Sequence, residues 1–328
     1  MDALAGLLEG PRARGAFALR VVMDPPWSLR VRDEAPLSVV AMVRGEAWLV
    51  PDDGEAAGLG PGDIAILRGP DPYTFADGPT TAPQVIIHPG QRCTTLDGRD
   101  LSRVMDLGVR TWGNSLDGSA VMLVGTYQGR TEVGQRLLGA LPALLVVRRD
   151  TWDSPLVGLL ADEIVRDEPG QEAVLDRLVD LVVIATLRAW FARPEAGAPA
   201  WYRAQSDPIV GRALRMLHNN PAHPWTVQSL AAEVGISRAA LARRFTELVG
   251  EPPMTFLTGW RLALAADLLR EPGTTIDAVA REVGYSNPFA LSTAFKRVRG
   301  VTPKQHRLDA SPRLAAAPGT GPVPLPSW

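Results

Sequence analysis

Thr226-Val-Gln-Ser-Leu-Ala-Ala-Glu-Val-Gly-Ile-Ser237 is the stretch that decides the fold of this 328-residue chain, because the same design returns at Thr275-Ile-Asp-Ala-Val-Ala-Arg-Glu-Val-Gly-Tyr-Ser286. Ten of the twelve aligned pairs are identical or similar in type. The register then slips by one residue, and three further pairs align: Phe245 with Phe295, Gly250 with Gly300, and Pro253 with Pro303. The chain therefore contains an internal repeat.

The first copy has the chemistry of a helix-turn-helix. Thr226 is a good N-cap for a helix with apolar residues at helical spacing, and Gly235 supplies the left-handed residue that ends it. Ser237 then caps a second helix. The inner face of that helix is predicted to hold Leu241, Phe245 and Leu248, and its outer face Ala239, Arg243, Arg244 and Thr246.

The second copy repeats this pattern. Gly284 ends its first helix, Ser286 or Asn287 caps the next, and Pro288 takes the first helical position, where its missing N–H costs nothing. The inner face is predicted to hold Leu291, Phe295 and Val298, and the outer face Phe289, Ser292, Thr293, Lys296 and Arg297. Burial of an apolar face explains the inner positions of both copies, but it does not explain a basic outer face that occurs twice.

The two copies are joined by one longer predicted helix, Met254 to Arg270, which ends at the breaker Glu271-Pro-Gly273. Two helix-turn-helix units on a rigid connector can enter successive major grooves on one face of B-DNA, about 34 Å apart. The segment from Gln205 to Arg307 carries thirteen Lys or Arg against eight Asp or Glu, so its net charge is +5 while the remainder is −7. The repeat and the charge together predict double-stranded DNA as a partner.

Residues 209–307 resemble the DNA-binding domain of the AraC/XylS family of bacterial transcription regulators. The matching motifs are Ser237-Arg-Ala-Ala-Leu-Ala-Arg-Arg-Phe245, Gly250-Glu-Pro-Pro253, Trp260-Arg-Leu262, Val283-Gly-Tyr-Ser286, Ala294-Phe-Lys-Arg297 and Gly300-Val-Thr-Pro-Lys-Gln-His-Arg307. Two positions depart from the family's pattern: Thr293 stands where an arginine is usual, and Arg299 where an aromatic residue is usual.

The resemblance implies a sequence-specific DNA-binding transcription regulator, with RNA polymerase as a further partner. It places Arg238, Ala239 and Arg243 in the first recognition helix, and Phe289 and Thr293 in the second, at base-reading positions. Arg243 can donate two hydrogen bonds to guanine, worth about 1–3 kcal/mol of discrimination. Phe289 and Thr293 offer only an apolar contact or a weak hydroxyl bond, so we expect the first helix to set most of the specificity. Phosphate contacts are expected from Arg244, Lys296 and Arg297.

Composition limits where the protein acts. The first ten residues have no basic segment and only a short apolar run, so they do not form a signal peptide. The ~20 consecutive apolar residues that would span a bilayer are not present. A single cysteine excludes an intramolecular disulfide framework. We therefore expect a soluble, cytoplasmic protein without a membrane partner.

Residues 16–128 read as short strands separated by turn residues, which favours a sandwich or barrel. The clearest strands are Phe17–Val22, Leu37–Val43, Glu46–Val50, Asp63–Leu67 and Gln84–Ile87. The order Trp27-Ser-Leu-Arg30, Val43-Arg-Gly-Glu-Ala-Trp-Leu49 and Leu59-Gly-Pro-Gly-Asp-Ile-Ala-Ile-Leu67 resembles the cupin-type sensor domain attached to many AraC-family regulators. That resemblance covers roughly residues 10–190.

The histidine count bears on enzymatic activity. A metal-dependent cupin enzyme needs about three histidines and a carboxylate around one ion. The chain has four histidines, and only His88 lies in the barrel segment. We therefore predict no enzymatic activity, no metal and no cofactor. A cupin metalloenzyme with an accessory DNA-binding module, and a DNA-binding protein without an effector, remain as alternatives.

The signal that the sensor receives is left open by the sequence. The segment His88-Pro-Gly-Gln-Arg-Cys93 allows three interpretations. In the first, His88 is a strand-end residue and Cys93 is a small buried hydrophobe. In the second, Arg92 and His88 lower the thiol pKa and make Cys93 a redox sensor, and in the third His88 and Cys93 form half of a metal site. Alternatively, a barrel interior that holds Trp27, Trp48 and Trp112 is the default pocket for a small apolar or aromatic effector.

From Thr131 the pattern changes to helices. A first helix begins near Val133, a second covers Pro155 to Arg166, and a third covers Gln171 to Phe191. The third is apolar around most of its circumference, so we expect it to pack under the barrel and also to form a homodimer seam through residues 150–192. The predicted domains are a cupin-like barrel at 1–130, a helical dimerisation segment at 131–193, a linker at 194–206, an all-α double helix-turn-helix domain at 207–307 and a disordered tail at 308–328.

Overall fold

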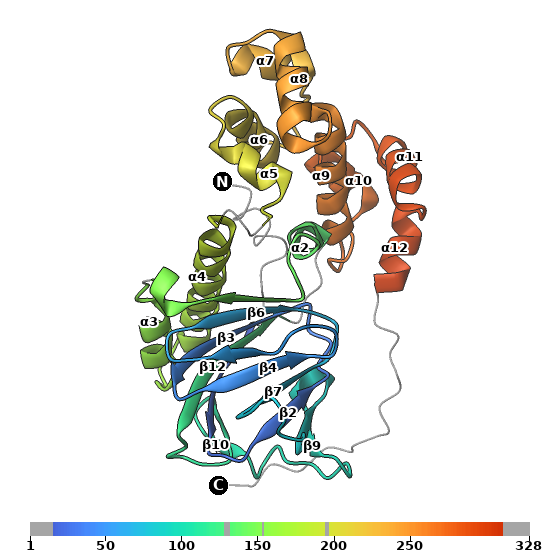
Figure 1. The fold of residues 1–328 in the computed structure, drawn as a ribbon. Helices are drawn as coiled ribbons and strands as arrows, with labels where there is room; N and C mark the ends of the chain where they lie inside the picture. Colours follow the sequence, from blue (N-terminus) through green and yellow to red (C-terminus); the bar gives the residue numbers. More distant parts are fainter. Residues whose placement is uncertain (1–15, 128–131, 153, 194–196, 311–328) are drawn as a thin grey trace.

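The computed structural model describes residues 16–127, 132–152, 154–193 and 197–310, and it has a β-rich part below a helical part (Figure 1). The expected tail lies almost entirely outside these ranges, as do residues 194–196 of the expected linker and the first fifteen residues. Within these ranges, every helix is too short or too polar to span a bilayer.

Two sheets face each other in the β-rich part. The first has the order β10-β11-β1-β12-β3-β6-β13 and the second the order β5-β4-β7-β2-β8-β9. The strands of the first sheet are β10 Asp106–Gly108, β11 Thr111–Gly113, β1 Ala16–Met23, β12 Ala120–Tyr127, β3 Leu37–Arg44, β6 Ile64–Arg68 and β13 Leu144–Val147. Those of the second are β5 Ala57–Leu59, β4 Ala47–Pro51, β7 Tyr73–Ala76, β2 Ser28–Val31, β8 Val85–Ile87 and β9 Cys93–Thr95. The five strands predicted from the sequence match β1, β3, β4, β6 and β8 to within one residue at each end.

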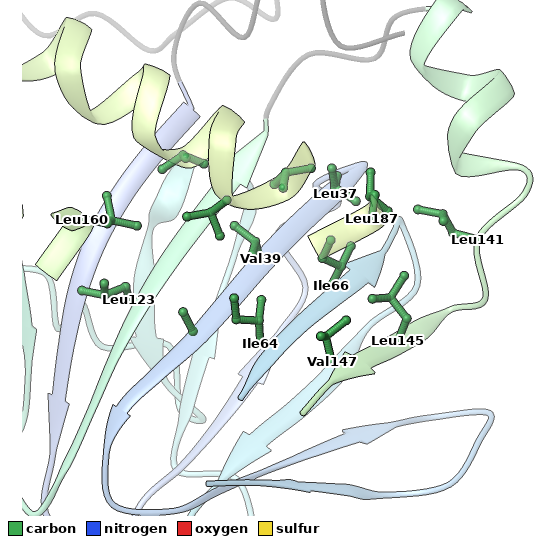
Figure 2. Close-up of a cluster of buried hydrophobic side chains, with 14 of the residues drawn as sticks. Leu37, Val39, Ile64, Ile66, Leu123, Leu141, Leu145, Val147, Leu160 and Leu187 are labelled. Carbon is green, nitrogen blue, oxygen red and sulfur yellow. The ribbon is translucent and has the colours of Figure 1, made fainter. Parts of the chain in front are cut away.

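The sheets enclose one apolar core, and two helices cover a second. Between the sheets lie buried side chains such as Val40, Leu49 and Met122. On the other face of the seven-stranded sheet, α3 (Leu156–Ile164) and α4 (Gln171–Phe191) pack over Val39, Ile64 and Leu123 (Figure 2). Gly125 lets α4 approach, because a Cβ at this position would lie 2.9 Å from Val179 Cγ1. The expected packing of residues 171–191 under the barrel is confirmed.

The segment 131–193 is not purely helical, contrary to the prediction. Leu144–Val147 forms β13, which pairs antiparallel with β6 and completes the seven-stranded sheet. A run of four apolar residues cannot be assigned by periodicity alone, and only pairing with β6 makes it a strand. Before it, α2 (Glu132–Leu138) lies between the barrel and the helical part (Figure 1).

The helical part contains both predicted helix-turn-helix units. Its helices are α5 Ala200–Arg203, α6 Val210–Asn219, α7 Val227–Glu233, α8 Arg238–Val249, α9 Pro253–Leu268, α10 Ile276–Glu282, α11 Pro288–Arg299 and α12 Pro303–Ala310. Residues 200–206, predicted as linker, form α5 and the 3-10 turn η4 (Ala204–Ser206), and Ala204 is buried in the core of the first unit. The helical part therefore begins near Ala200, and its last described residue is Ala310, so the first three residues of the expected tail are helical.

Side-chain caps start the helices of each unit as predicted. Thr226 and Ser237 accept from the backbone N–H of Ser229 and Ala240, at 3.0 and 3.2 Å. In the second unit, Thr275 and Asn287 accept from Ala278 and Ala290, at 3.1 and 2.9 Å. Phe245 and Phe295 are fully buried, but the inner-face prediction was wrong for Leu248 and Val298, which are 37% and 55% exposed. Both lie in the last turn of their helices.

Candidate DNA interface and effector cavity

The first recognition helix, α8, presents its base-reading candidates to solvent. Arg238 occupies the first helical position after the Ser237 cap, and Ala239 and Arg243 lie four residues apart on one exposed face. The Arg243 side chain is 79% exposed, and its Nε is 3.8 Å from Glu247 Oε1. An exposed pair at this distance contributes little, so the Arg243 guanidinium can turn to another acceptor.

The second recognition helix, α11, has the same geometry with different chemistry. Both helices run for twelve residues after the cap, so Phe289 stands at the position of Ala239 and Thr293 at that of Arg243. Phe289 is 83% exposed and Thr293 is exposed beside it. An exposed phenylalanine next to an exposed threonine suits an apolar contact with a thymine methyl group.

The three phosphate-contact candidates differ in their surroundings. Lys296 and Arg297 are exposed on α11. Arg244 is instead held by Asp207: its Nη2 lies 2.6 Å and its Nε 3.1 Å from Asp207 Oδ2. The other oxygen of Asp207 accepts from the backbone N–H groups of Ile209 and Val210. Arg244 therefore joins α8 to the start of α6, and a phosphate group would have to compete with Asp207 for it.

The barrel encloses a cavity of about 180 Å³ between its two sheets. Its lining is mostly aliphatic and aromatic, with Asp33, Tyr73, Gln91, Ser102 and Thr126 as the hydroxyl, amide and carboxyl side chains. Two donors on this lining, Trp112 Nε1 and Gln91 Nε2, are buried and have no hydrogen-bond partner among the described residues. Of the other tryptophans considered, Trp27 packs edge-on against Phe75 and Trp48 lies against Gly58.

Cys93 also lines this cavity, but not in the environment that a redox sensor requires. Burial, with a smaller contribution from the Asp100 carboxylate, raises the pKa of the Cys93 thiol to about 11. His88 Nε2 lies 2.9 Å from Thr94 Oγ1, so its ring bonds to the neighbouring threonine. Of the three alternatives for this segment, the structure therefore favours Cys93 as a small buried side chain, because the pKa of its thiol is raised and not lowered. A group of three or more metal-ligating side chains is not found in the described ranges.

A contact between the two parts of the chain was not foreseen from the sequence. The Glu132 backbone N–H donates to Asp267 Oδ1 at 2.7 Å, and Asp267 is only 3% exposed. The Glu132 carboxylate accepts from Arg270 Nη2 at 3.3 Å and lies 3.0 Å from Arg299 Nη1. We refer to Glu132, Asp267, Arg270 and Arg299 as the interdomain cluster. Of these four residues, Arg299 is the one that stood out in the sequence, because it replaces the aromatic residue usual in the family that the sequence resembles.

Comparisons with known proteins agree with this two-part organisation. Residues 2–192 match a family model described as cupin, and residues 230–309 match one described as a helix-turn-helix domain. An AraC-like transcription regulator of Streptomyces lividans is 31% identical, over 94% of this chain and 98% of that protein. Another, of Streptomyces antibioticus, is 30% identical over 95% of this chain and 100% of that protein. Among solved structures, the DNA-binding domain of AdpA in complex with a target DNA is 30% identical, with a TM-score of 0.31, over 34% of this chain and 100% of that chain.

Proposed function

This chain belongs to the AraC-like transcription regulators with a cupin-type N-terminal domain, and we propose that a small molecule in its barrel controls how its two recognition helices meet DNA. As a member of this family it is a DNA-binding regulator of transcription. Its relatives are named as regulators, which supports a binding role for the cupin domain instead of catalysis. We place its action in the cytoplasm, with RNA polymerase as a further partner.

The observation that carries this proposal is that a strand of the cavity wall comes shortly before the interdomain cluster along the chain. Val124 and Thr126 on β12 line the cavity, and β12 ends at Tyr127. A few positions later Glu132 begins α2 and enters the interdomain cluster. A ligand that displaces β12 would therefore act on a strand that ends five positions before Glu132, the residue that contacts Arg270 and Arg299. The raised pKa of the Cys93 thiol favours a small molecule over a redox signal at this site.

For DNA recognition, we assign base reading to Arg238, Ala239, Arg243, Phe289 and Thr293. Lys296 and Arg297 are the exposed cations for phosphate contacts, and Arg244 is a third candidate only when it leaves Asp207. Affinity that rests on phosphate contacts falls steeply with salt, whereas base discrimination does not. This difference separates the two groups of residues experimentally.

We also propose that the protein is a homodimer through the outer face of α4. The inner face of this helix is covered by the barrel, but Val174 and Leu181 on its outer face are 45% and 46% exposed. Leu159 on the adjacent α3 is exposed as well. An apolar stripe of this kind suits a self-complementary two-fold interface. Leu181→Glu should shift the mass measured by light scattering from dimer to monomer, whereas Leu116→Glu, at an exposed leucine of the barrel, should not.

Selection of binding sites from a random DNA pool tests the DNA part of the proposal. The full-length protein should enrich sites with two sequence elements about one helical turn apart.

The proposed regulation through the cavity is tested with two variants. Val124→Phe fills the cavity, whereas Val43→Phe places the same side chain at a solvent-exposed position of the neighbouring strand. Val124→Phe should change the affinity for the selected site about fivefold or more, an energy within the reach of overpacking, and Val43→Phe should leave it unchanged. Equal behaviour of the two variants would remove the cavity from the mechanism.

A further inference from the structure

The size of the barrel cavity limits what can occupy it. A cavity of about 150 Å³ lined by leucine, isoleucine and phenylalanine is large enough for benzene. The cavity here has about 180 Å³, and aliphatic and aromatic side chains such as Leu19, Val21, Leu29, Val40 and Phe75 form most of its wall. It therefore takes one aromatic ring with a short substituent.

Two buried hydrogen-bond donors indicate which substituent the ligand needs. Trp112 is 9% exposed, and its Nε1 has no acceptor among the described residues. The same holds for Gln91 Nε2. An unpaired buried donor is costly, so both groups favour a ligand that brings an acceptor oxygen into the cavity. Gln91 also has a backbone φ of 62°, a region that non-glycine residues rarely occupy and that often marks functional positions.

The surroundings of the cavity disfavour an anion. Asp33 and Tyr73 line both this cavity and an adjacent polar pocket of about 330 Å³. The adjacent pocket is also lined by Asp52, Asp53 and Asp71, with Arg68 as the cation among its lining residues. Asp52 is paired with Arg30, but the remaining carboxylates give this side of the cavity a negative potential that repels an incoming carboxylate.

We infer that the effector is an uncharged, single-ring aromatic compound with a carbonyl-type oxygen, which accepts hydrogen bonds from Trp112 Nε1 and Gln91 Nε2. This inference rests on the proposed function for the regulatory meaning of the cavity, but not for the binding itself. It excludes aromatic carboxylates and plain hydrocarbons of the same size as preferred ligands.

Calorimetric titration of the full-length protein with three matched probes tests the inference. Acetophenone has the ring and the acceptor, ethylbenzene has the same shape without the acceptor, and benzoate has acceptors with a negative charge. Acetophenone should bind about tenfold or more tightly than each of the others, the size expected when an acceptor reaches buried donors. Equal binding of acetophenone and ethylbenzene, tighter binding of benzoate, or no binding of any probe would each overturn the inference.

Variants locate the preference within the cavity. Trp112→Phe keeps an aromatic ring but removes the donor, so the preference for acetophenone over ethylbenzene should fall to about twofold or less, with Gln91→Leu lowering it partly. Trp190→Phe is the matched control, because Trp190 Nε1 is also buried without a partner among the described residues but does not line the cavity. An unchanged preference in Trp112→Phe, or an equal loss in Trp190→Phe, would contradict the assignment.

The result can be separated from the proposed function because the titrations contain no DNA. If acetophenone binds with the expected preference but the affinity for the selected DNA site is the same with and without it, the ligand chemistry stands and the regulatory role of the cavity fails. If selection enriches no DNA site, the DNA-binding assignment fails while the cavity result stands.

Discussion

The two helix-turn-helix units share one scaffold and differ at the positions that face outward. Both have side-chain caps, a twelve-residue recognition helix, a buried phenylalanine and a left-handed glycine at the end of that helix. At the residue before this glycine, the first unit has Val249, which is buried, and the second has Arg299, which contacts Glu132 of the α2 segment. The repeat thus keeps its caps and core, while its surface positions have diverged.

This divergence suggests a division of labour. Under the proposed assignment the first unit reads guanine through Arg243, and its Arg244 is engaged by Asp207 within the DNA-binding part. The second unit offers Phe289 and Thr293, with little capacity for base discrimination, but it is fixed to the barrel side through Arg299. We expect the first unit to select the site and the second to report the state of the sensor.

The largest expected difference between the units concerns base discrimination. Arg243→Ala should lower the preference for the correct base at one guanine by about 1–3 kcal/mol, because a bidentate contact is lost. Thr293→Ala, at the equivalent position of the second unit, should change it much less. Fluorescence anisotropy with single-base variants of the selected site measures both. Equal weakening of binding to specific and scrambled DNA by Arg243→Ala would contradict this difference between the units.

The second difference concerns attachment to the sensor. Arg299→Val gives the second unit the residue of the first and removes one of the charged partners of Glu132, a loss of about 1–2 kcal/mol for a partly buried ion pair. Amides of α2 should then exchange with deuterium roughly five- to thirtyfold faster. Arg297→Val, at an exposed arginine of the same helix, is the control. Unchanged exchange in Arg299→Val would show that the ion pair does not hold α2.

The two helix-turn-helix units could be predicted closely from the sequence because their signals are local. Thr226, Ser237 and Asn287 cap the next residues along the chain, and the glycines end helices through their own backbone conformation. The same reasoning found β1, β3, β4, β6 and β8, but it did not single out the eight-residue β12 or short strands such as β5 and β9–β11. Three residues contain no readable alternation, and they become strands only by pairing with neighbours that fold beside them.

The sites show the same limit. Exposure of Arg243, Phe289 and Thr293 followed from helical spacing, because the outer face of a helix can be read from the inner one. The interdomain cluster could not be predicted, since Arg270 and Glu132 are 138 positions apart. The raised pKa of the Cys93 thiol comes mainly from burial within the tertiary fold, which the residues beside it in the sequence do not reveal.

A third prediction concerns the shared scaffold. Ser237→Ala and Asn287→Ala each remove the side-chain cap of a recognition helix, so each should lower the free energy of unfolding by about 1 kcal/mol. Urea unfolding of the full-length protein, followed by helical circular dichroism, measures the change. Similar losses would support an equivalent scaffold in the two units. A loss confined to one variant would show that the units have diverged in stability as well as in surface.

The smallest expected effect separates cations that look alike in the sequence. Lys296→Ala removes an exposed charge, so it should weaken binding to all DNA sequences alike and reduce the slope of log affinity against log salt by about 1. Arg244→Ala should change the slope by much less, because the Arg244 guanidinium is already engaged by Asp207 and releases no counterion while it stays there. Anisotropy titrations between low and physiological salt give both slopes. An Arg244→Ala slope change as large as that of Lys296→Ala would mean that DNA displaces Asp207, and the first unit would then contribute phosphate contacts as well as base reading.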